Sequence, residues 1–396
     1  MKSIWEESLS VQAEVIKHRR YLHEHAEVGF DLPKTTEYIY NQLKKYGFLA
    51  KKMKKGGVIA EIPAKDGGRD EIILLRADVD GLKIQEESGL EFACPNGRMH
   101  ACGHDMHAAA LLGAAKLLKN KRLPCSVRLL FQPAEELLQG GKYALSQGVA
   151  ERVKCAFSLH VLSGVEAPVG TILLPVAGVT APSADNFTLS FTGKSCHGAT
   201  PQEGVDAIAA ANAVWQGLQT LVAREIATGD GVVTVGGFQA GESPNVISEK
   251  AVLQGTCRTF DDATRAYLKK RIREMTKWVS QAYRVRGETR YSGGCPCLRQ
   301  DEKLLESAKR SWTESWGKEK VSATFSTQKR VGASEDFAYI AEAVPSLLIS
   351  VVASQKGGGY PLHHPRLVFE ERALSTCVAC YLSFAIQVGV EFKKGN

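Results

Sequence analysis

Hydrophobic positions up to about residue 175 alternate between two periodicities. Residues 35–48, "TTEYIYNQLKKYGF", place apolar side chains three or four apart, which predicts an amphipathic helix ending at Gly47. Residues 71–80, "EIILLRADVD", and 126–136, "SVRLLFQPAEE", are short apolar runs that pass into polar loops, which is typical of buried strands. This alternation predicts an α/β sheet, in which ligands collect at the loops beyond the carboxyl ends of the strands.

The pattern changes between residues 183 and 293. Four segments have strand-like spacing and two have helical spacing, in the order strand, helix, strand, strand, helix, strand: 185–194, 204–224, 231–241, 249–260, 263–283 and 284–293. This βαββαβ order is that of a ferredoxin-like unit. We therefore expect residues 183–293 to form an inserted satellite domain. Residues 1–182 and 294–396, where the α/β pattern returns, are expected to form the catalytic domain.

Composition and charge favour a globular protein of two domains. The 396 residues exceed the roughly 250–300 at which a single core stops growing, and 44% hydrophobic and 23% charged residues are ordinary for globular proteins. The net charge of +7 is spread along the chain without a nucleic-acid-binding signature, so no nucleic-acid partner is expected. No window approaches about 18 consecutive apolar residues, so no membrane span is expected. The first residues lack the apolar core of a secretory signal, so the ten cysteines are expected to be reduced thiols in a cytoplasmic protein.

Residues 99–109, "MHACGHDMHAA", hold the densest group of candidate ligands. Cys102 and His104 lie two apart, just before an Ala/Leu-rich segment that predicts a helix starting near Asp105. The partial positive charge of a helix N-terminus favours a thiolate, and a thiolate with an imidazole makes half of a tetrahedral metal site. Taken alone, the stretch fits a buried structural cysteine and a hydrogen-bonded histidine better than a metal site.

Further candidate ligands follow other apolar segments. Glu135 and Glu136 come after a predicted strand, where two anions repel unless a cation offsets them, although alone they also fit a solvated pair at a helix start. His160 ends the strand-like "CAFSLHV", and His363 and His364 lie in "PLHHP". Each histidine by itself is more often structural. Together the candidates offer five ligands, too many for one tetrahedral ion but suitable for two ions that share a bridge: Cys102, His104, Glu136, His160 and one of the C-terminal histidines, His363 or His364.

Eight motifs occur in one order between about residues 19 and 385: "RADVDGLKI", "MHACGHDMHAA", "FQPAEE", "SLHV", "HGATPQEGVDAI", "PNVISEKAVLQGTCRTFD", "ASEDFAYI" and "LHHP". The chain thereby resembles the dinuclear metal amidohydrolases that include hippurate hydrolase, N-acyl-amino-acid amidohydrolases and indoleacetyl-amino-acid hydrolases, relatives of aminoacylase and carboxypeptidase G. The resemblance implies a metallopeptidase-type catalytic domain, with a central mixed sheet flanked by helices, that carries the ferredoxin-like satellite. "GKSCHGA" and "NVISE" depart from the usual "GKGGHGA" and "NVIPD" without removing a functional group.

The resemblance also implies a role for each of ten residues. Glu135 would be the general base, and Asp80 would orient a metal ligand without contacting the metal ion itself. His197 would reach the site of a partner subunit and polarise the scissile carbonyl. Asn245 and Arg258 would hold the substrate carboxylate. Five residues would hold the two metal ions, with the cysteine as the bridge: Cys102, His104, Glu136, His160 and His363.

The implied reaction is metal-dependent hydrolysis of the amide bond of N-acyl amino acids, such as acetyl or benzoyl conjugates, by a metal-bridging water that Glu135 activates. Two divalent ions per subunit are implied, and Zn, Mn, Co and Ni all suit these ligands. The implied partners are a small N-acyl amino acid or dipeptide and a second copy of the chain, in a homodimer or higher oligomer formed through the satellite domain.

Three alternatives stay open. The same site could serve a dipeptidase, a carboxypeptidase or an aminobenzoyl-glutamate hydrolase. A cysteine hydrolase would use Cys102 as nucleophile and His104 or His107 as base, and would tolerate chelators, but it leaves the two glutamates without a role. A non-catalytic metal-binding homologue would be expected to lack Glu135 or a ligand, and none is missing.

Overall fold

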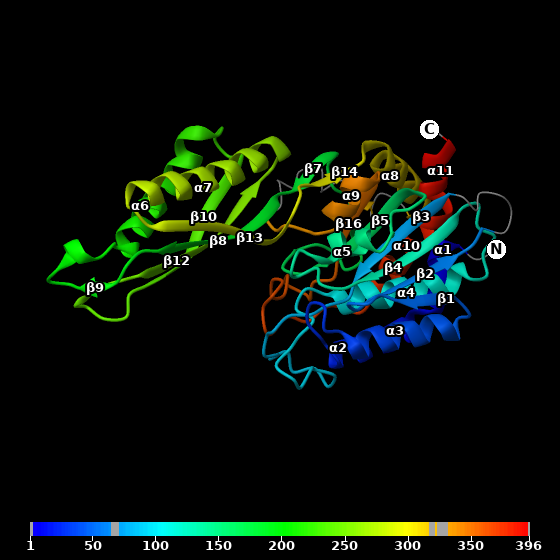
Figure 1. Cartoon of the computed structure of the whole chain (residues 1–396). Helices are drawn as coiled ribbons and strands as arrows, with labels where there is room; N and C mark the ends of the chain where they lie inside the picture. Colours follow the sequence, from blue (N-terminus) through cyan, green and yellow to red (C-terminus); the bar gives the residue numbers. More distant parts are fainter. Residues whose placement is uncertain (1–2, 65–70, 317–320, 323–331, 395–396) are drawn as a thin grey trace. The chain divides into compact units, whose positions relative to one another are not determined.

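The computed structural model of the chain describes residues 3–64, 71–316, 321–322 and 332–394. The chain divides into two compact units (Figure 1). The first comprises Met1–Thr180, Arg299–Lys329 and Glu335–Asn396, and the second comprises Ala181–Leu298 with a short segment ending at Ser334. Each unit has its own buried hydrophobic cluster, so each is described by itself.

The first unit contains an eight-stranded mixed sheet. Its central strands β4, β3, β5 and β16 run parallel to one another, whereas β2 runs antiparallel to β4. This arrangement confirms the predicted α/β class with a central mixed sheet. In order across the sheet, the strands are β1 (Leu49–Lys52), β2 (Val58–Ile62), β4 (Ser126–Gln132), β3 (Ile72–Asp78), β5 (Val153–Leu162), β16 (Ser346–Val352), β6 (Ile172–Leu173) and β15 (Val321–Ser322).

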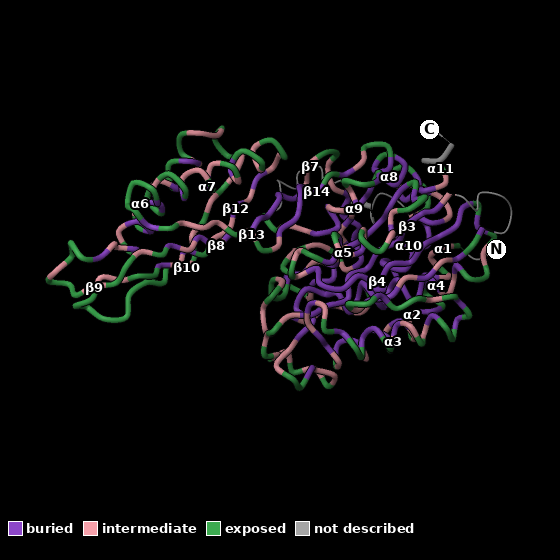
Figure 2. Tube along the Cα trace, viewed as in Figure 1, coloured by how far each residue is buried: buried purple, intermediate pink, exposed green. Residues whose placement is uncertain are grey.

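Helices flank this sheet. Strands β3 and β4 are buried at every position, as expected for parallel strands that are covered on both faces (Figure 2). Helices α4 and α10 pack on each other and contact β5, and α2 packs on α4. The helices of this unit are α1 (Ile4–Ser10), α2 (Gln12–Glu24), α3 (Pro33–Lys45), α4 (His104–Leu118), α5 (Gly140–Ser146), α8 (Glu302–Trp316), α9 (Ala338–Ala343), α10 (Ala373–Ser383) and α11 (Gly389–Lys394), with the π-helical turn Phe384–Val388 between the last two.

The register of the central strands brings distant segments to one edge of the sheet. Asp78 at the end of β3 pairs with Gln132 at the end of β4, so both strands end at the same level. On the other side of β3, Arg76 pairs with Ser158, two residues before His160 on β5. The loops that carry Asp80 and Glu135 therefore leave the sheet beside His160, at the edge where ligands collect in such sheets.

The second unit is an antiparallel sheet with two helices. Its elements follow one another as β8 (Ser183–Thr192), α6 (Ala207–Thr220), β10 (Gly231–Ala240), β12 (Lys250–Thr259), α7 (Asp262–Ala282) and β13 (Arg286–Cys295), and the strands lie in the order β10-β12-β8-β13. Alternate residues of β8, namely Phe187, Leu189 and Phe191, are buried in one cluster with apolar residues of α6 and α7. Each helix begins at an aspartate cap, Asp206 or Asp261, whose carboxylate accepts backbone N–H bonds.

Short elements complete the described part of the chain. Strands β9 (Cys196–His197) and β11 (Val246–Ile247) pair antiparallel, and β7 (Gly178–Ala181) pairs with β14 (Leu298–Gln300). A 3₁₀ turn spans Pro201–Glu203, and a π-helical turn spans Leu221–Glu225.

Among the described helices, one continuous run, Ala373–Glu391, is long and apolar enough to cross a membrane by length and composition, a feature not expected from the sequence. Its apolar window is 83% buried within the protein, and Cys377 and Cys380 on it lie in the core. Core packing therefore accounts for its apolar composition. All ten cysteines are free thiols.

Candidate metal and catalytic site

A left-handed glycine turn places Cys102 and His104 next to each other. Helix α4 begins at His104, and its N-cap is Gly103 with φ 90°. A Cβ atom at Gly103 would lie 2.3 Å from Val161 Cγ2, so this position requires glycine. Both flanking side chains are buried at the edge of the sheet, where His160 lies two residues before the end of β5.

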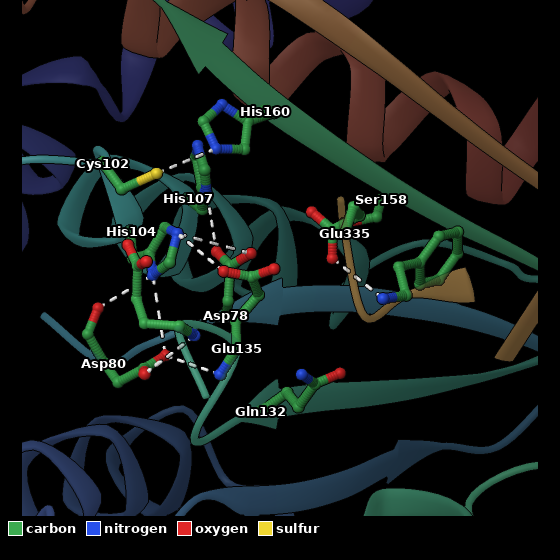
Figure 3. Close-up of polar contacts among 12 residues, drawn as sticks. Asp78, Asp80, Cys102, His104, His107, Gln132, Glu135, Ser158, His160 and Glu335 are labelled. Atoms are coloured by element: carbon green, nitrogen blue, oxygen red, sulfur yellow. Dashed lines mark hydrogen bonds and ion pairs between the residues drawn. The ribbon is translucent and has the colours of Figure 1, made fainter. Parts of the chain in front are cut away.

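Hydrogen bonds fix the tautomers of His104 and His160. The Nδ1–H of His104 donates to the carbonyl oxygen of Asp80 at 2.8 Å (Figure 3). The Nδ1–H of His160 donates to the carbonyl oxygen of Val161 at 2.6 Å. The Nε2 atom of each ring is then free to accept. His104 Nε2 is buried without a hydrogen-bond partner, and His160 Nε2 lies 3.4 Å from Cys102 Sγ. A histidine held at one nitrogen with the other free is the arrangement that metal ligands adopt.

The C-terminal loop adds His363. Its backbone N–H donates to the carbonyl oxygen of Ala101 at 2.9 Å, and its Nε2 lies 3.5 Å from Glu136 Oε1. His363 has φ 66°, an uncommon conformation for a residue with a side chain. The neighbouring His364 instead stacks on Tyr360, with ring centroids 4.1 Å apart. Of the two histidines, only His363 faces this site.

The five expected ligands lie in overlapping groups. The ligand atoms of Cys102, His104 and His160 lie within 4.8 Å of one another, and so do those of Cys102, Glu136 and His363. Cys102 belongs to both groups, which is the position that a bridging ligand requires. His104 Nε2 and Glu136 Oε1 are buried atoms without hydrogen-bond partners, which are rare unless a ligand or ion satisfies them. Sulfur, imidazole and carboxylate donors together fit borderline divalent cations.

Asp80 holds the backbone that carries the two glutamates. Its Oδ1 accepts a hydrogen bond from the N–H of Glu135 at 3.0 Å, and its Oδ2 accepts one from the N–H of Glu136 at 3.3 Å. Because its carbonyl oxygen also binds His104, Asp80 orients three site residues. Helix α5 begins only at Gly140, so the interpretation of the glutamates as a solvated pair at a helix start is wrong.

Burial dominates the electrostatics of the site. It raises the pKa of the Glu135 carboxyl well above its usual range, and Glu335 and Asp336 raise it further. It lowers the pKa of His160 to about 3. Burial also raises the pKa of the Cys102 thiol and outweighs the opposite effect of His104. The expectation that the helix N-terminus makes this thiol acidic is therefore wrong, and a thiolate here needs a cation in contact with it.

Sequence reasoning assigned no role to Arg76 or Asp78, and it considered His107 only as an alternative base for Cys102. His107 donates from Nδ1 to Asp78 Oδ1 at 2.6 Å and accepts the Val161 N–H at Nε2 at 2.8 Å, so both ring nitrogens are occupied. His107 is thus unsuited as a ligand or as a base for Cys102. Arg76 is fully buried and donates to Asp78 Oδ2 at 2.6 Å. An arginine inside the apolar run "EIILLRADVD" was the available signal, because a buried guanidinium needs carboxylate partners.

The remaining three expected residues belong to the second unit. His197 is exposed, and its Nδ1 accepts the N–H of Ala199 at 3.1 Å. The carbonyl oxygen of Asn245 accepts the N–H of Gly198 at 2.7 Å, which places Asn245 beside His197. Arg258 on β12 donates to Ser334 Oγ at 2.7 Å.

Known proteins share both this sequence and this fold. Residues 74–387 match peptidase family M20/M25/M40. The chain belongs to this family. Proteins with similar sequences include the N-acetylcysteine deacetylase of Bacillus subtilis, 34% identical over 94% of this chain and 96% of that protein, and the N-acyl-L-amino acid amidohydrolase of Geobacillus stearothermophilus, 37% identical over 74% of this chain and 80% of that protein. A crystal structure of a Bacillus subtilis dinuclear metal-binding peptidase of family M20 superposes with a TM-score of 0.78, at 32% identity over 96% of this chain and 98% of that chain. The resemblance seen in the motifs is confirmed, and the protein is a hydrolase.

Proposed function

We propose that the protein hydrolyses the amide bond of N-acyl amino acids, releasing a carboxylic acid and a free amino acid. One observation carries the proposal: a carboxylate oxygen of buried Glu135 lies within 4.8 Å of ligand atoms of His104 and Glu136, two of the five candidate metal ligands. The names of the relatives, a deacetylase of N-acetylcysteine and an N-acyl-L-amino acid amidohydrolase, support this substrate class.

Two divalent cations are proposed to be held by Cys102, His104, Glu136, His160 and His363. When bound, such ions supply Lewis-acid polarisation of the scissile carbonyl and of the attacking water. Zn, Mn, Co and Ni all fit the donor set, and metal analysis of the purified protein identifies the ion.

Glu135 is proposed to move the proton. Its carboxylate accepts a proton from the attacking water and returns it to the leaving amine, whose expulsion as an anion would otherwise be prohibitive. His197 can donate from Nε2 to the oxygen of the scissile carbonyl, because its Nδ1 already accepts a backbone N–H. Asn245 and Arg258 are proposed to bind the substrate carboxylate.

A cysteine hydrolase with Cys102 as nucleophile is the alternative to a metal-dependent hydrolase. Cys102 Sγ lies 3.4 Å from His160 Nε2, within hydrogen-bonding distance for sulfur. However, burial raises the pKa of this thiol and lowers the pKa of His160 to about 3, which is the reverse of an activated thiolate–imidazolium pair.

The proposed protein is a homodimer in which His197 acts on the site of the partner subunit. Its proposed location is the cytoplasm.

The test is release of free amino acid from acetyl, benzoyl, aminobenzoyl and dipeptide substrates. Metal-loaded wild type, chelator-treated wild type and Glu135→Gln at equal metal content are compared. We expect activity that chelation abolishes and that Glu135→Gln lowers by about 10²–10⁴-fold, the range of general acid–base catalysis. Activity that survives chelation but not thiol alkylation would instead establish the cysteine hydrolase, and equal activity in Glu135→Gln would remove Glu135 as the base.

A further inference from the structure

The carboxylate of Asp336 contacts both ends of the segment that carries Glu135 and Glu136. Its Oδ1 accepts a hydrogen bond from Gln132 Nε2 at 2.7 Å, and its Oδ2 accepts one from the N–H of Gly141 at 2.8 Å. The backbone N–H of Asp336 also donates to Glu135 Oε1 at 3.4 Å. One fully buried residue, distant in sequence, thus bonds before, within and after residues 133–140.

Residues 133–139 of this segment lack regular secondary structure and contain two unfavourable backbone conformations. Ala134 and Leu138 have φ values of 59° and 52°, in the left-handed region that residues with a side chain rarely adopt. Such conformations persist only when the surroundings fix them. Asp80 fixes the two N–H groups in the middle of the segment, and Asp336 fixes its ends. A Cβ atom at Gly141 would lie 2.2 Å from the carbonyl oxygen of Asp336, so the two backbones are in close approach.

Asp336 is itself held by Arg76. The five N–H groups of this buried guanidinium meet five acceptors at 2.6–3.3 Å, namely Gln132 Oε1, Asp78 Oδ2, Ser158 Oγ, Glu335 Oε1 and Asp336 Oδ1. Because Arg76 lies on β3, in the middle of the sheet, it anchors Asp336 to the most buried part of the unit. The contact from Asp336 to the glutamate segment is therefore a connection to a rigid element.

We propose that Asp336 is a positioning residue that fixes the glutamate segment, and through it Glu135 and Glu136, in the geometry needed for hydrolysis. This role rests on the proposed function, in which Glu135 is the base and Glu136 a metal ligand. Its carboxylate must accept from both Gln132 and Gly141, so an amide of the same shape cannot replace it. In Asp336→Asn, an NH₂ group replaces one of the two oxygens and can no longer accept a bond.

Two matched variants separate positioning from other effects of the same network. Glu335→Gln also removes a negative charge close to Glu135, since the two carboxylates lie within 4.8 Å of each other, but no hydrogen bond joins Glu335 to residues 132–141 among the described contacts. Ser158→Ala removes an acceptor of Arg76 and leaves Asp336 with its bonds. The first is the control for charge, and the second is the control for loss of a bond to Arg76.

The direct measurement is amide hydrogen exchange of the peptide that covers residues 133–141, in metal-free protein. Losing a buried hydrogen bond to a charged group should speed local opening, so Asp336→Asn is expected to exchange at least about 5-fold faster in this peptide. Glu335→Gln and Ser158→Ala are expected to exchange at the wild-type rate there. With an N-acyl amino acid as substrate, kcat of Asp336→Asn is expected to fall at least about tenfold with little change in KM.

Thermal unfolding shows whether each variant is folded. If Asp336→Asn does not fold, Gln132→Met removes the bond to Asp336 at the start of the segment together with one acceptor of Arg76, a loss for which Ser158→Ala is the control. This variant is expected to speed exchange in the segment to a smaller extent. The proposal is overturned if the folded variant, Asp336→Asn or Gln132→Met, exchanges the peptide of residues 133–141 at the wild-type rate. It is also overturned if both controls exchange this peptide as fast as that variant does. If Glu135→Gln loses activity while Asp336→Asn keeps the wild-type kcat, the proposed function stands and the positioning role fails. If the wild type hydrolyses no N-acyl amino acid, the proposed function fails independently of the exchange result.

Discussion

Backbone hydrogen bonds give histidines of this protein opposite chemical roles. His104 and His160 each donate from Nδ1 to a carbonyl oxygen, so Nε2 presents a lone pair that suits a cation. His197 instead accepts a backbone N–H at Nδ1, so the ring proton of the neutral form stays on Nε2 and can be donated. The residue type therefore does not fix the role, and the neighbouring backbone decides it.

His197→Ala is expected to lower kcat by about 10²-fold or more, because it removes a hydrogen-bond donor to the oxygen on which negative charge develops. Metal content is expected to be unchanged, because His197 lies outside the ligand cluster. Steady-state kinetics together with metal analysis of the same preparation measures both. An unchanged kcat would remove His197 from the mechanism.

Arg258→Ala is expected to raise KM chiefly for substrates with a free carboxylate, because a guanidinium binds a carboxylate through two parallel hydrogen bonds. The comparison is with methyl-ester and amide analogues of the same substrate, which lack that charge. A similar loss of kcat/KM for charged and neutral analogues would contradict the assignment.

At the scale of elements, a buried histidine joins helices α2 and α3. His18 is 4% exposed, and its Nδ1 and Nε2 each lie 2.8 Å from a tyrosine hydroxyl, those of Tyr38 and Tyr46. The hydroxyl of Tyr46 donates onward to Glu14 Oε1 at 2.9 Å, so it can accept from His18 Nε2 while Nδ1 accepts from Tyr38. With a neutral imidazole, each donor in this series of hydrogen bonds from Tyr38 to Glu14 has an acceptor.

This arrangement predicts a pH-dependent stability. Burial lowers the pKa of His18 to about 4, below its usual 6.5, so the unfolded chain takes up the proton first as the pH falls. The contribution of His18 is therefore present above pH 6.5 and is lost by about 3 kcal/mol as the pH falls to 4. His18→Gln replaces the imidazole with an amide that can hydrogen-bond but does not titrate. Urea unfolding of the two proteins at pH 7.5 and 4 should show the larger loss in wild type, and equal losses would contradict the assignment.

At the scale of the whole molecule, the expected site residues are divided between two units with separate cores. The candidate ligands and Glu135 belong to the first unit, whereas His197, Asn245 and Arg258 belong to the second. If His197 serves the site of a partner subunit, each complete site needs residues from two subunits. Mixing two inactive variants tests this requirement.

Mixing Glu135→Gln protein with His197→Ala protein, under conditions that exchange subunits, is expected to restore activity. In a mixed dimer the His197→Ala subunit keeps its Glu135 and receives His197 from its partner, so one complete site forms. Random exchange makes half of the dimers mixed, so about a quarter of the sites should be complete in a twofold-symmetric dimer. Activity that stays at the sum of the separate variants would show that His197 acts within its own subunit or that no dimer forms.

Features that depend on residues close together in the sequence could be predicted from it, whereas features that depend on contacts between distant residues could not. The short apolar runs in "EIILLRADVD" and "SVRLLFQPAEE" predicted β3 and β4 and the α/β class, because a strand that is buried on both faces is apolar at most positions. The motifs led to the family, and the geometry brings the five candidate ligands together. Asp336 and Asp78 were within quoted motifs but received no role, because their importance lies in contacts with residues far along the chain.

The sequence by itself thus determined the fold class, the family and a set of candidate ligands, since these depend on the order and type of residues. Only the tertiary structure decided that His363 rather than His364 faces Glu136, that His107 is occupied at both nitrogens, and that the Cys102 thiol is less acidic than a helix N-terminus suggests. Each of these depends on burial and hydrogen-bond direction, which arise when β3, β4, β5 and the C-terminal loop come together in space.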